Sequence, residues 1–213
     1  MRMLHLTSPN LPVGAFAYSQ GLEGAVDCHW VNDPESLGAW LRLQVQEGLA
    51  YVELPLLIRS HQACMNGNVT GLQYWNALLL ACRETEELRL SEIATGTALA
   101  RLLPTLSVPL PMLSPATFLC LYAHAAAHWQ ISWQAAAAAY TWAWLENQVI
   151  AATRLFPLGQ TQAQGLLVTL QDVAERAVAQ AEAVTDDDIG TSLSGVALAS
   201  LHHENQYSRL FRS

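Results

Sequence analysis

Apolar residues repeat at spacings of three and four along most of this chain, and proline, glycine or asparagine interrupts the repeats. A period of about 3.6 residues places apolar side chains on one face of an α-helix. The strict alternation of apolar and polar residues that marks a half-buried strand occurs nowhere over a useful length. The pattern therefore predicts an all-α fold without a sheet.

Capping residues and prolines predict the helix ends. Asp33-Pro34 and Ser114-Pro115 each combine an N-cap residue with proline at the first helical position. Ser132 begins a long alanine-rich helix that Pro157 stops. Residues 104–113 contain three prolines and form a linker. The expected helices cover residues 34–49, 55–65, 70–103 (continuous, or broken and restarted), 114–128, 132–156 and 161–185.

Two atypical segments lie near the ends of the chain. Residues 7–24 hold two prolines and three glycines, and residues 189–213 close in QYSRLFRS. A chain of 213 residues suits one domain. We therefore expect a single compact, bundle-like helical domain over residues 1–188, with 7–24 as a motif loop. The segment 189–213 is expected to be mobile until a partner protein orders it.

Charged residues are scarce. They make up 13% of the chain, and hydrophobic residues make up 52%, whereas about 25% of residues are charged in a typical soluble domain. Such a composition leaves apolar surface exposed, and exposed apolar patches mark interaction sites. The composition predicts an oligomer or an obligate partner.

Several functional classes are disfavoured by what the chain lacks. A net charge of −8 argues against nucleic-acid binding. All ten basic residues are arginines, so no lysine can form a Schiff base, and no phosphate-binding loop motif is present. The four cysteines are widely spaced and predict no disulfide framework. With no leader and no apolar run long enough to span a membrane, we expect a cytoplasmic protein.

Four segments resemble, in order, the motifs of the urease accessory protein UreF family. They are spread over nearly the whole chain and read SPNLPVGAFAYSQGLE (8–23), ACRETEELR (81–89), PLGQTQAQGLL (157–167) and HHENQYSRLFRS (202–213). The resemblance implies an all-α protein that forms a dimer and binds a second accessory protein, UreD (UreH in some systems). This pair recruits the nickel-carrying GTPase UreG and docks on apo-urease.

In this family the chain is implied to be a scaffold that promotes nickel insertion and catalyses nothing itself. No cofactor is expected to bind stably, because nickel and GTP are handled by partner proteins. The alternative function is regulation of GTP hydrolysis by UreG, with Arg154 as the contact candidate. A guanidinium supplied in trans can stabilise phosphoryl-transfer charge, although Arg154 also suits packing near a helix C-terminus.

The N-terminal motif loop is a candidate partner surface. Its prolines restrict the backbone and its glycines permit turns, so aromatic side chains can be held outward as anchors. A carboxylate at the following helix start can pair with an arginine of the partner. The other interpretation is a loop that plugs the helical core with its aromatic residues inward. The candidate contacts are Pro12, Gly14, Phe16, Tyr18, Ser19 and Glu23.

The segment ACRETEELR predicts a charged helix face. Arg83 lies three and four residues before Glu86 and Glu87, the spacing of ion pairs within one helix. Such a face is either simply solvated or a docking face for the GTPase or the dimer mate. Glu86 and Arg89 are the candidate contacts for docking.

The C-terminal segment combines apolar residues with two arginines on an acidic protein. The resemblance implies that this end binds UreD, and short segments of this kind can fold against a partner. The alternative is a final helix docked on its own domain. The candidate contacts are Tyr207, Arg209, Leu210, Phe211, Arg212 and Ser213.

Two sets of residues are weak metal-site candidates, and neither is firm. Cys120, His124 and His128 recur at helical spacing, which allows ligands to face one metal ion. Their alanine-rich surroundings favour core packing instead. His202 and especially His203 form the second weak candidate.

Overall fold

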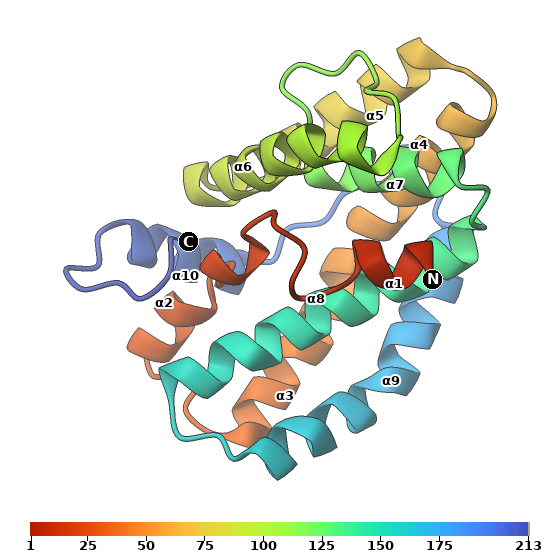
Figure 1. The fold of residues 1–213 in the computed structure, drawn as a ribbon. Coiled ribbons are helices and arrows are strands. Elements are labelled where there is room, and N and C mark those ends of the chain that lie inside the picture. The colour runs from red at the N-terminus through yellow and green to blue at the C-terminus, as the bar shows by residue number, and fades with distance from the viewer. Residues whose placement is uncertain (213) are drawn as a thin grey trace.

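The computed structural model describes residues 1–212, so Ser213 lies outside the described part. Within residues 1–212 every regular element is helical and no strand is formed, which confirms the all-α prediction (Figure 1). None of these helices combines the length and apolar character needed to cross a bilayer. The α-helices are α1 (Arg2–Leu6), α2 (Leu22–Asp27), α3 (Pro34–Leu43), α4 (Glu53–Met65), α5 (Val69–Ala81), α6 (Glu86–Leu102), α7 (Phe118–His128), α8 (Trp133–Leu155), α9 (Gln160–Ala183) and α10 (Ser194–Glu204). Short 3-10 or π segments are η1 (Ala15–Ala17), η2 (Gln44–Leu49), η3 (Leu103–Leu106) and η4 (Asp186–Asp188).

Local capping signals set several helix ends as predicted. The Asp33 carboxylate accepts a hydrogen bond from the Ser36 amide at 2.8 Å, and α3 begins at Pro34. The Ser132 hydroxyl accepts from the Ala135 amide at 3.3 Å at the start of α8. These side chains satisfy amides that have no partner within their own helix.

The third expected helix breaks and restarts, which was one of the two alternatives. Asn68 caps α5, because its side chain accepts from the Gly71 amide at 2.8 Å, so this helix begins at Val69, one residue before the expected start. The chain leaves the helix after Ala81, and Thr85 caps α6. The residues between the two helices are therefore not helical.

The prediction that a helix begins at Ser114-Pro115 is wrong, because α7 begins at Phe118. Thr117 is the N-cap, and both its amide and its hydroxyl donate to the Asn76 side-chain oxygen, at 3.0 and 2.9 Å. The Asn76 amide group in turn donates to the Pro115 carbonyl at 2.9 Å. This tertiary clamp holds the loop against α5 and delays the start of the helix.

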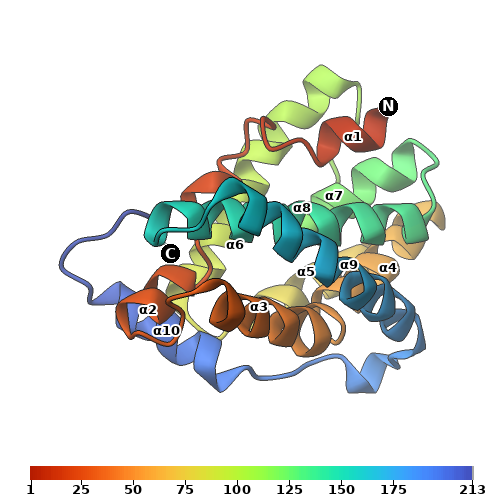
Figure 2. The ribbon, with the colours of Figure 1, turned by 90° about the horizontal axis from the view of Figure 1, so that it is seen from below.

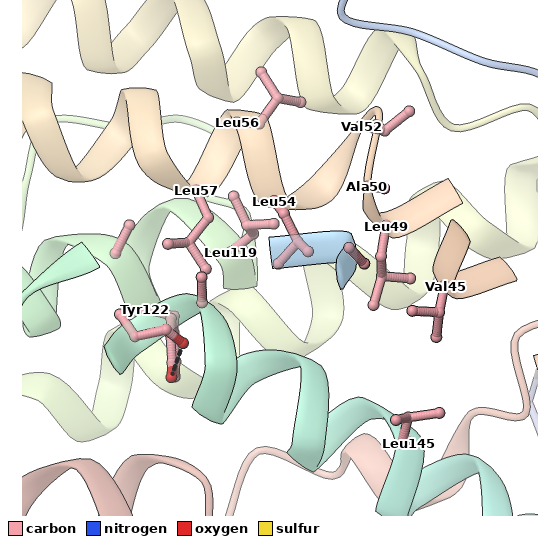
Figure 3. Close-up of a cluster of buried hydrophobic side chains, with 14 of the residues drawn as sticks. Val45, Leu49, Ala50, Val52, Leu54, Leu56, Leu57, Leu119, Tyr122 and Leu145 are labelled. Atoms are coloured by element: carbon pink, nitrogen blue, oxygen red, sulfur yellow. Dashed lines mark hydrogen bonds between the residues drawn. The ribbon is translucent and has the colours of Figure 1, made fainter. Parts of the chain in front are cut away.

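The hydrophobic core gathers around α4, which packs against α5, α7, α8 and α9. Figure 3 shows Leu54 and Leu57 of α4 facing Leu119 and Tyr122 of α7. All four side chains are buried. The Tyr122 hydroxyl donates to the Ala136 carbonyl at 2.9 Å, so its polar atom is satisfied inside the core.

Helices α2 and α10 cross closely, although they lie at opposite ends of the sequence (Figure 2). The reason is that Gly24 of α2 has no side chain at the crossing. A Cβ atom added to Gly24 would lie 2.1 Å from the Ala199 carbonyl oxygen. The close approach of the two backbones therefore requires glycine, and it brings the C-terminal segment against the N-terminal motif.

We expect Gly24→Ala to displace α10 and to lower the free energy of unfolding by about 1–3 kcal/mol, because overpacking forces the backbone to shift. The matched control is Gly165→Ala in α9, where an added Cβ meets nothing within 4 Å. That variant is expected to gain about 0.5–1 kcal/mol from helix propensity. Urea unfolding of both variants measures the difference. A Gly24→Ala protein as stable as the unmodified chain would contradict the close crossing.

Candidate partner-binding surface

The N-terminal motif loop was predicted over residues 7–24, but residues 22–24 belong to α2, so the loop connects α1 to α2 through residues 7–21. Its backbone φ is positive at Gly14 (73°), Gln20 (52°) and Gly21 (86°), a region that glycine tolerates best. Leu11 and Val13 are buried in the core, whereas the Phe16 side chain is 55% exposed. The loop thus packs on the domain through aliphatic residues and presents an aromatic ring to solvent.

The C-terminal segment ends beside this loop, near α2 (Figure 1). The Arg212 amide donates to the Ala17 carbonyl at 2.8 Å. Phe211 is 5% exposed and belongs to the hydrophobic core. We call the exposed parts of residues 12–18 and 205–212 the two-end surface, since both ends of the chain contribute to it.

Glu23 connects the two ends from beneath this surface. Its carboxylate is buried and accepts hydrogen bonds from the amides of Leu210 and Phe211, at 2.7 and 2.8 Å. Ser19 is also fully buried, and its hydroxyl accepts from the Glu23 amide at 3.2 Å. The expectation that Glu23 pairs with a partner's arginine does not fit this arrangement, because the carboxylate already binds the chain's own C-terminal segment.

The other predicted contact residues divide by exposure. Gly14 and Tyr18 are half-buried, and Phe211 is buried. The predicted contacts that are exposed on the two-end surface are Pro12, Phe16, Tyr207, Arg209, Leu210 and Arg212. The predicted contact Ser213 lies outside the described residues. The exposed set comprises the predicted contacts that a partner can reach.

Residues 194–212 lie against the helical domain in this structure. Helix α10 contacts α2 and α6, and the Ser200 and Thr85 hydroxyls lie 2.7 Å apart between α10 and the start of α6. This arrangement matches the alternative of a final helix docked on its own domain. Ordering of the segment by a partner stays a prediction.

His203, proposed as a weak metal candidate, lies between two carboxylates. It is 0% exposed, with Nδ1 2.8 Å from Glu87 Oε2 and Nε2 3.0 Å from Glu23 Oε2. Arg209 donates to the other Glu87 oxygen at 2.9 Å. His202 faces away and contacts Asp27 at 2.7 Å. The two histidines therefore do not share a site.

The residues of the second metal candidate are engaged in other contacts or exposed. The Cys120 thiol lies 3.3 Å from the Ser60 hydroxyl, whereas His124 Nε2 lies 2.7 Å from the Pro109 carbonyl, and His128 is exposed. Burial raises the pKa of Cys120 to about 11, so the thiol stays protonated at neutral pH, and burial lowers the pKa of His124. Across residues 1–212, no group of three or more His, Cys, Asp or Glu side chains is placed to hold a metal ion.

The prediction of ion pairs from Arg83 to Glu86 and Glu87 on one helix is wrong, because Arg83 lies in the break between α5 and α6. Arg83 instead forms two partly buried salt bridges, one with Glu53 of α4 and one with Glu92 of α6. Burial alone would lower the pKa of Arg83, but the two carboxylates outweigh this effect and raise it, so the guanidinium stays charged.

The charged segment therefore has two different sides. Arg83 and Glu87 point inward and hold elements of the domain together. Glu86 and Arg89 are exposed, and Arg89 also donates to the Leu80 carbonyl at 2.8 Å. The side chains of Glu86 and Arg89 are accessible for the predicted docking role, which stays a prediction.

Arg154 is exposed near the C-terminal end of α8. It lines a cavity of about 570 Å³ between residues 6–20 and α8. Phe16, Trp144 and Glu146 line the same cavity. The structure thus brings the GTPase-contact candidate close to the N-terminal motif loop, which the sequence did not indicate.

The sequence did not indicate that Glu87 connects α6 to the C-terminal segment, or that the Glu23 carboxylate faces the interior of the chain. Glu87 meets His203 and Arg209, which follow it by 116 and 122 residues. No periodic pattern records contacts over such separations. The only available signal was that Glu23 and His203 each fall within a motif of the resemblance.

Comparison with known proteins identifies the family. The UreF family model matches residues 31–171. Urease accessory protein UreF of Marinomonas sp. (strain MWYL1) is 46% identical, covering 100% of this chain and 94% of the relative. The proteins of the same name from Alkalilimnicola ehrlichii and Klebsiella pneumoniae subsp. pneumoniae are 46% and 42% identical, covering 100% of this chain and 95% and 97% of theirs. These matches confirm the resemblance seen in the four motifs, and the chain belongs to the UreF family.

Proposed function

We propose that this chain is a urease accessory protein that acts as a non-catalytic scaffold. In this proposal it binds UreD (UreH), recruits the GTPase UreG and docks on apo-urease as a dimer within the complex, in the cytoplasm. Its contribution is positional, because holding reactants in place lowers the entropic cost of a transfer step. Nickel and GTP are bound by the partner proteins.

The two-end surface is the observation that carries this proposal. Two motifs separated by nearly the whole chain meet through Glu23, and they present Phe16, Tyr207 and Leu210 to solvent. Aromatic and large apolar side chains are typical anchors of protein interfaces. On a chain with few charges, this exposed apolar set supports a protein partner rather than a charged small molecule.

The alternative function is regulation of GTP hydrolysis by UreG. Its support is the position of Arg154, exposed at a cavity beside the N-terminal motif loop. In that mechanism the guanidinium enters the nucleotide site of the GTPase and stabilises charge in the transition state. The scaffold proposal requires no such insertion, so one variant separates the two.

We expect the double variant Tyr207→Ala/Leu210→Ala to weaken binding of UreD by about tenfold or more, because interface anchors often contribute over 1 kcal/mol each. Co-purification of the full chain with UreD, followed by titration of the purified proteins, measures this effect. Both side chains are exposed, so the fold should be unchanged.

Tyr74→Ala serves as the matched control, since Tyr74 is an exposed aromatic residue of α5 outside the two-end surface. It should bind UreD normally. Equal binding by the double variant and the control would contradict the proposed surface. Unchanged thermal unfolding of both variants is required for the comparison.

A second prediction separates scaffold from regulator. We expect Arg154→Ala to leave GTP hydrolysis by the assembled complex with UreD and UreG unchanged within about twofold. If Arg154 acts on the nucleotide, the rate should instead fall by a factor on the order of 10³ or more. Arg176→Ala, an exposed arginine of α9 that does not line the cavity, is the control.

A further inference from the structure

The ring of His203 occupies an unusual environment for a histidine. It is completely buried, and each ring nitrogen faces a carboxylate oxygen: Nδ1 faces Glu87 and Nε2 faces Glu23, at 2.8 and 3.0 Å. Ionised carboxylates only accept hydrogen bonds. A neutral imidazole has one N–H group, so it can satisfy one of these carboxylates and must oppose its lone pair to the other.

The imidazolium form removes this conflict, because both nitrogens then donate. It also places a positive charge between two buried negative charges, which would otherwise be costly inside the protein. We propose that His203 is a protonated positioning residue that fixes Glu23 and Glu87, and that these two carboxylates in turn hold residues 209–211. This Glu23–His203–Glu87 lock deepens the proposed function and rests on it for the role of the C-terminal segment.

Each carboxylate of the lock also holds the C-terminal segment directly. The Glu23 oxygens accept from the amides of Leu210 and Phe211, at 2.7 and 2.8 Å. The remaining Glu87 oxygen accepts from Arg209 at 2.9 Å. The His203 ring therefore fixes both carboxylates that hold residues 209–211. These residues include Leu210, whose exposed side chain belongs to the two-end surface.

The charges around the lock are nearly balanced. Helix α2 contributes Glu23, α6 contributes Glu87, and the C-terminal segment contributes Arg209. Helix α10 contributes His203 itself and Glu204, whose Oε1 lies 3.4 Å from the Glu87 amide. Without the proton on His203, Arg209 would be the one cation within residues 1–212 that forms an ion pair with these carboxylates. Loss of that proton would free the Glu23 and Glu87 carboxylates from His203, and residues 209–211 would become exposed to solvent.

The test compares two adjacent histidines of α10 in the full chain without partners. In His203→Gln, hydrogen exchange of the Leu210 and Phe211 amides should speed up by about tenfold or more, because two charged hydrogen bonds are lost. In His202→Gln, the exposed neighbour, exchange at these amides should stay within about twofold of the unmodified chain. Wild-type exchange rates in His203→Gln would overturn the proposal.

The unmodified protein provides a second readout that does not depend on the folding of a variant. Nitrogen-15 spectra of the imidazole at neutral pH should show a proton on both ring nitrogens of His203. A spectrum with one unprotonated ring nitrogen would overturn the proposal. Failure to bind UreD by a chain that shows both protons would count against the proposed function and leave the lock intact.

Discussion

The buried carboxylate of Glu23 is the constraint on which the functional end of the molecule depends. An ionised carboxylate inside a protein needs donors, since its desolvation is otherwise uncompensated. Here the donors are His203 and the amides of Leu210 and Phe211, all supplied by the far end of the chain. The glycine at position 24 lets α10 approach closely enough to supply them.

The same arrangement explains how a chain with few charges uses them. Arg83 joins α4 to α6 through Glu53 and Glu92, and Glu87 joins α6 to the C-terminal segment. These charged groups lie against one another within the domain, and each partner takes the place of the water that would otherwise solvate the charge. The two-end surface is left mainly to apolar and aromatic side chains, which suits association with proteins.

Much of the fold was predictable because its signals are local. Asp33 and Ser132 cap their helices through residues three positions ahead, and Pro157 follows the end of α8. Where a tertiary contact competes with such a signal, the prediction was wrong. Asn76 clamps Thr117 and moves the start of α7 away from Ser114, and the break between α5 and α6 turns Arg83 toward Glu53 and Glu92.

The sequence by itself determined the helical class, several helix ends and the family, since periodicity, capping and motifs are carried by neighbouring residues. Only the tertiary structure decided which charged residues are exposed and which connect the two ends. Glu23 and His203 are 180 residues apart, and Glu87 and Arg209 are 122 apart. Contacts of this kind arise from the crossing of α2 and α10 and from the need to satisfy buried charge, and neither leaves a pattern along the chain.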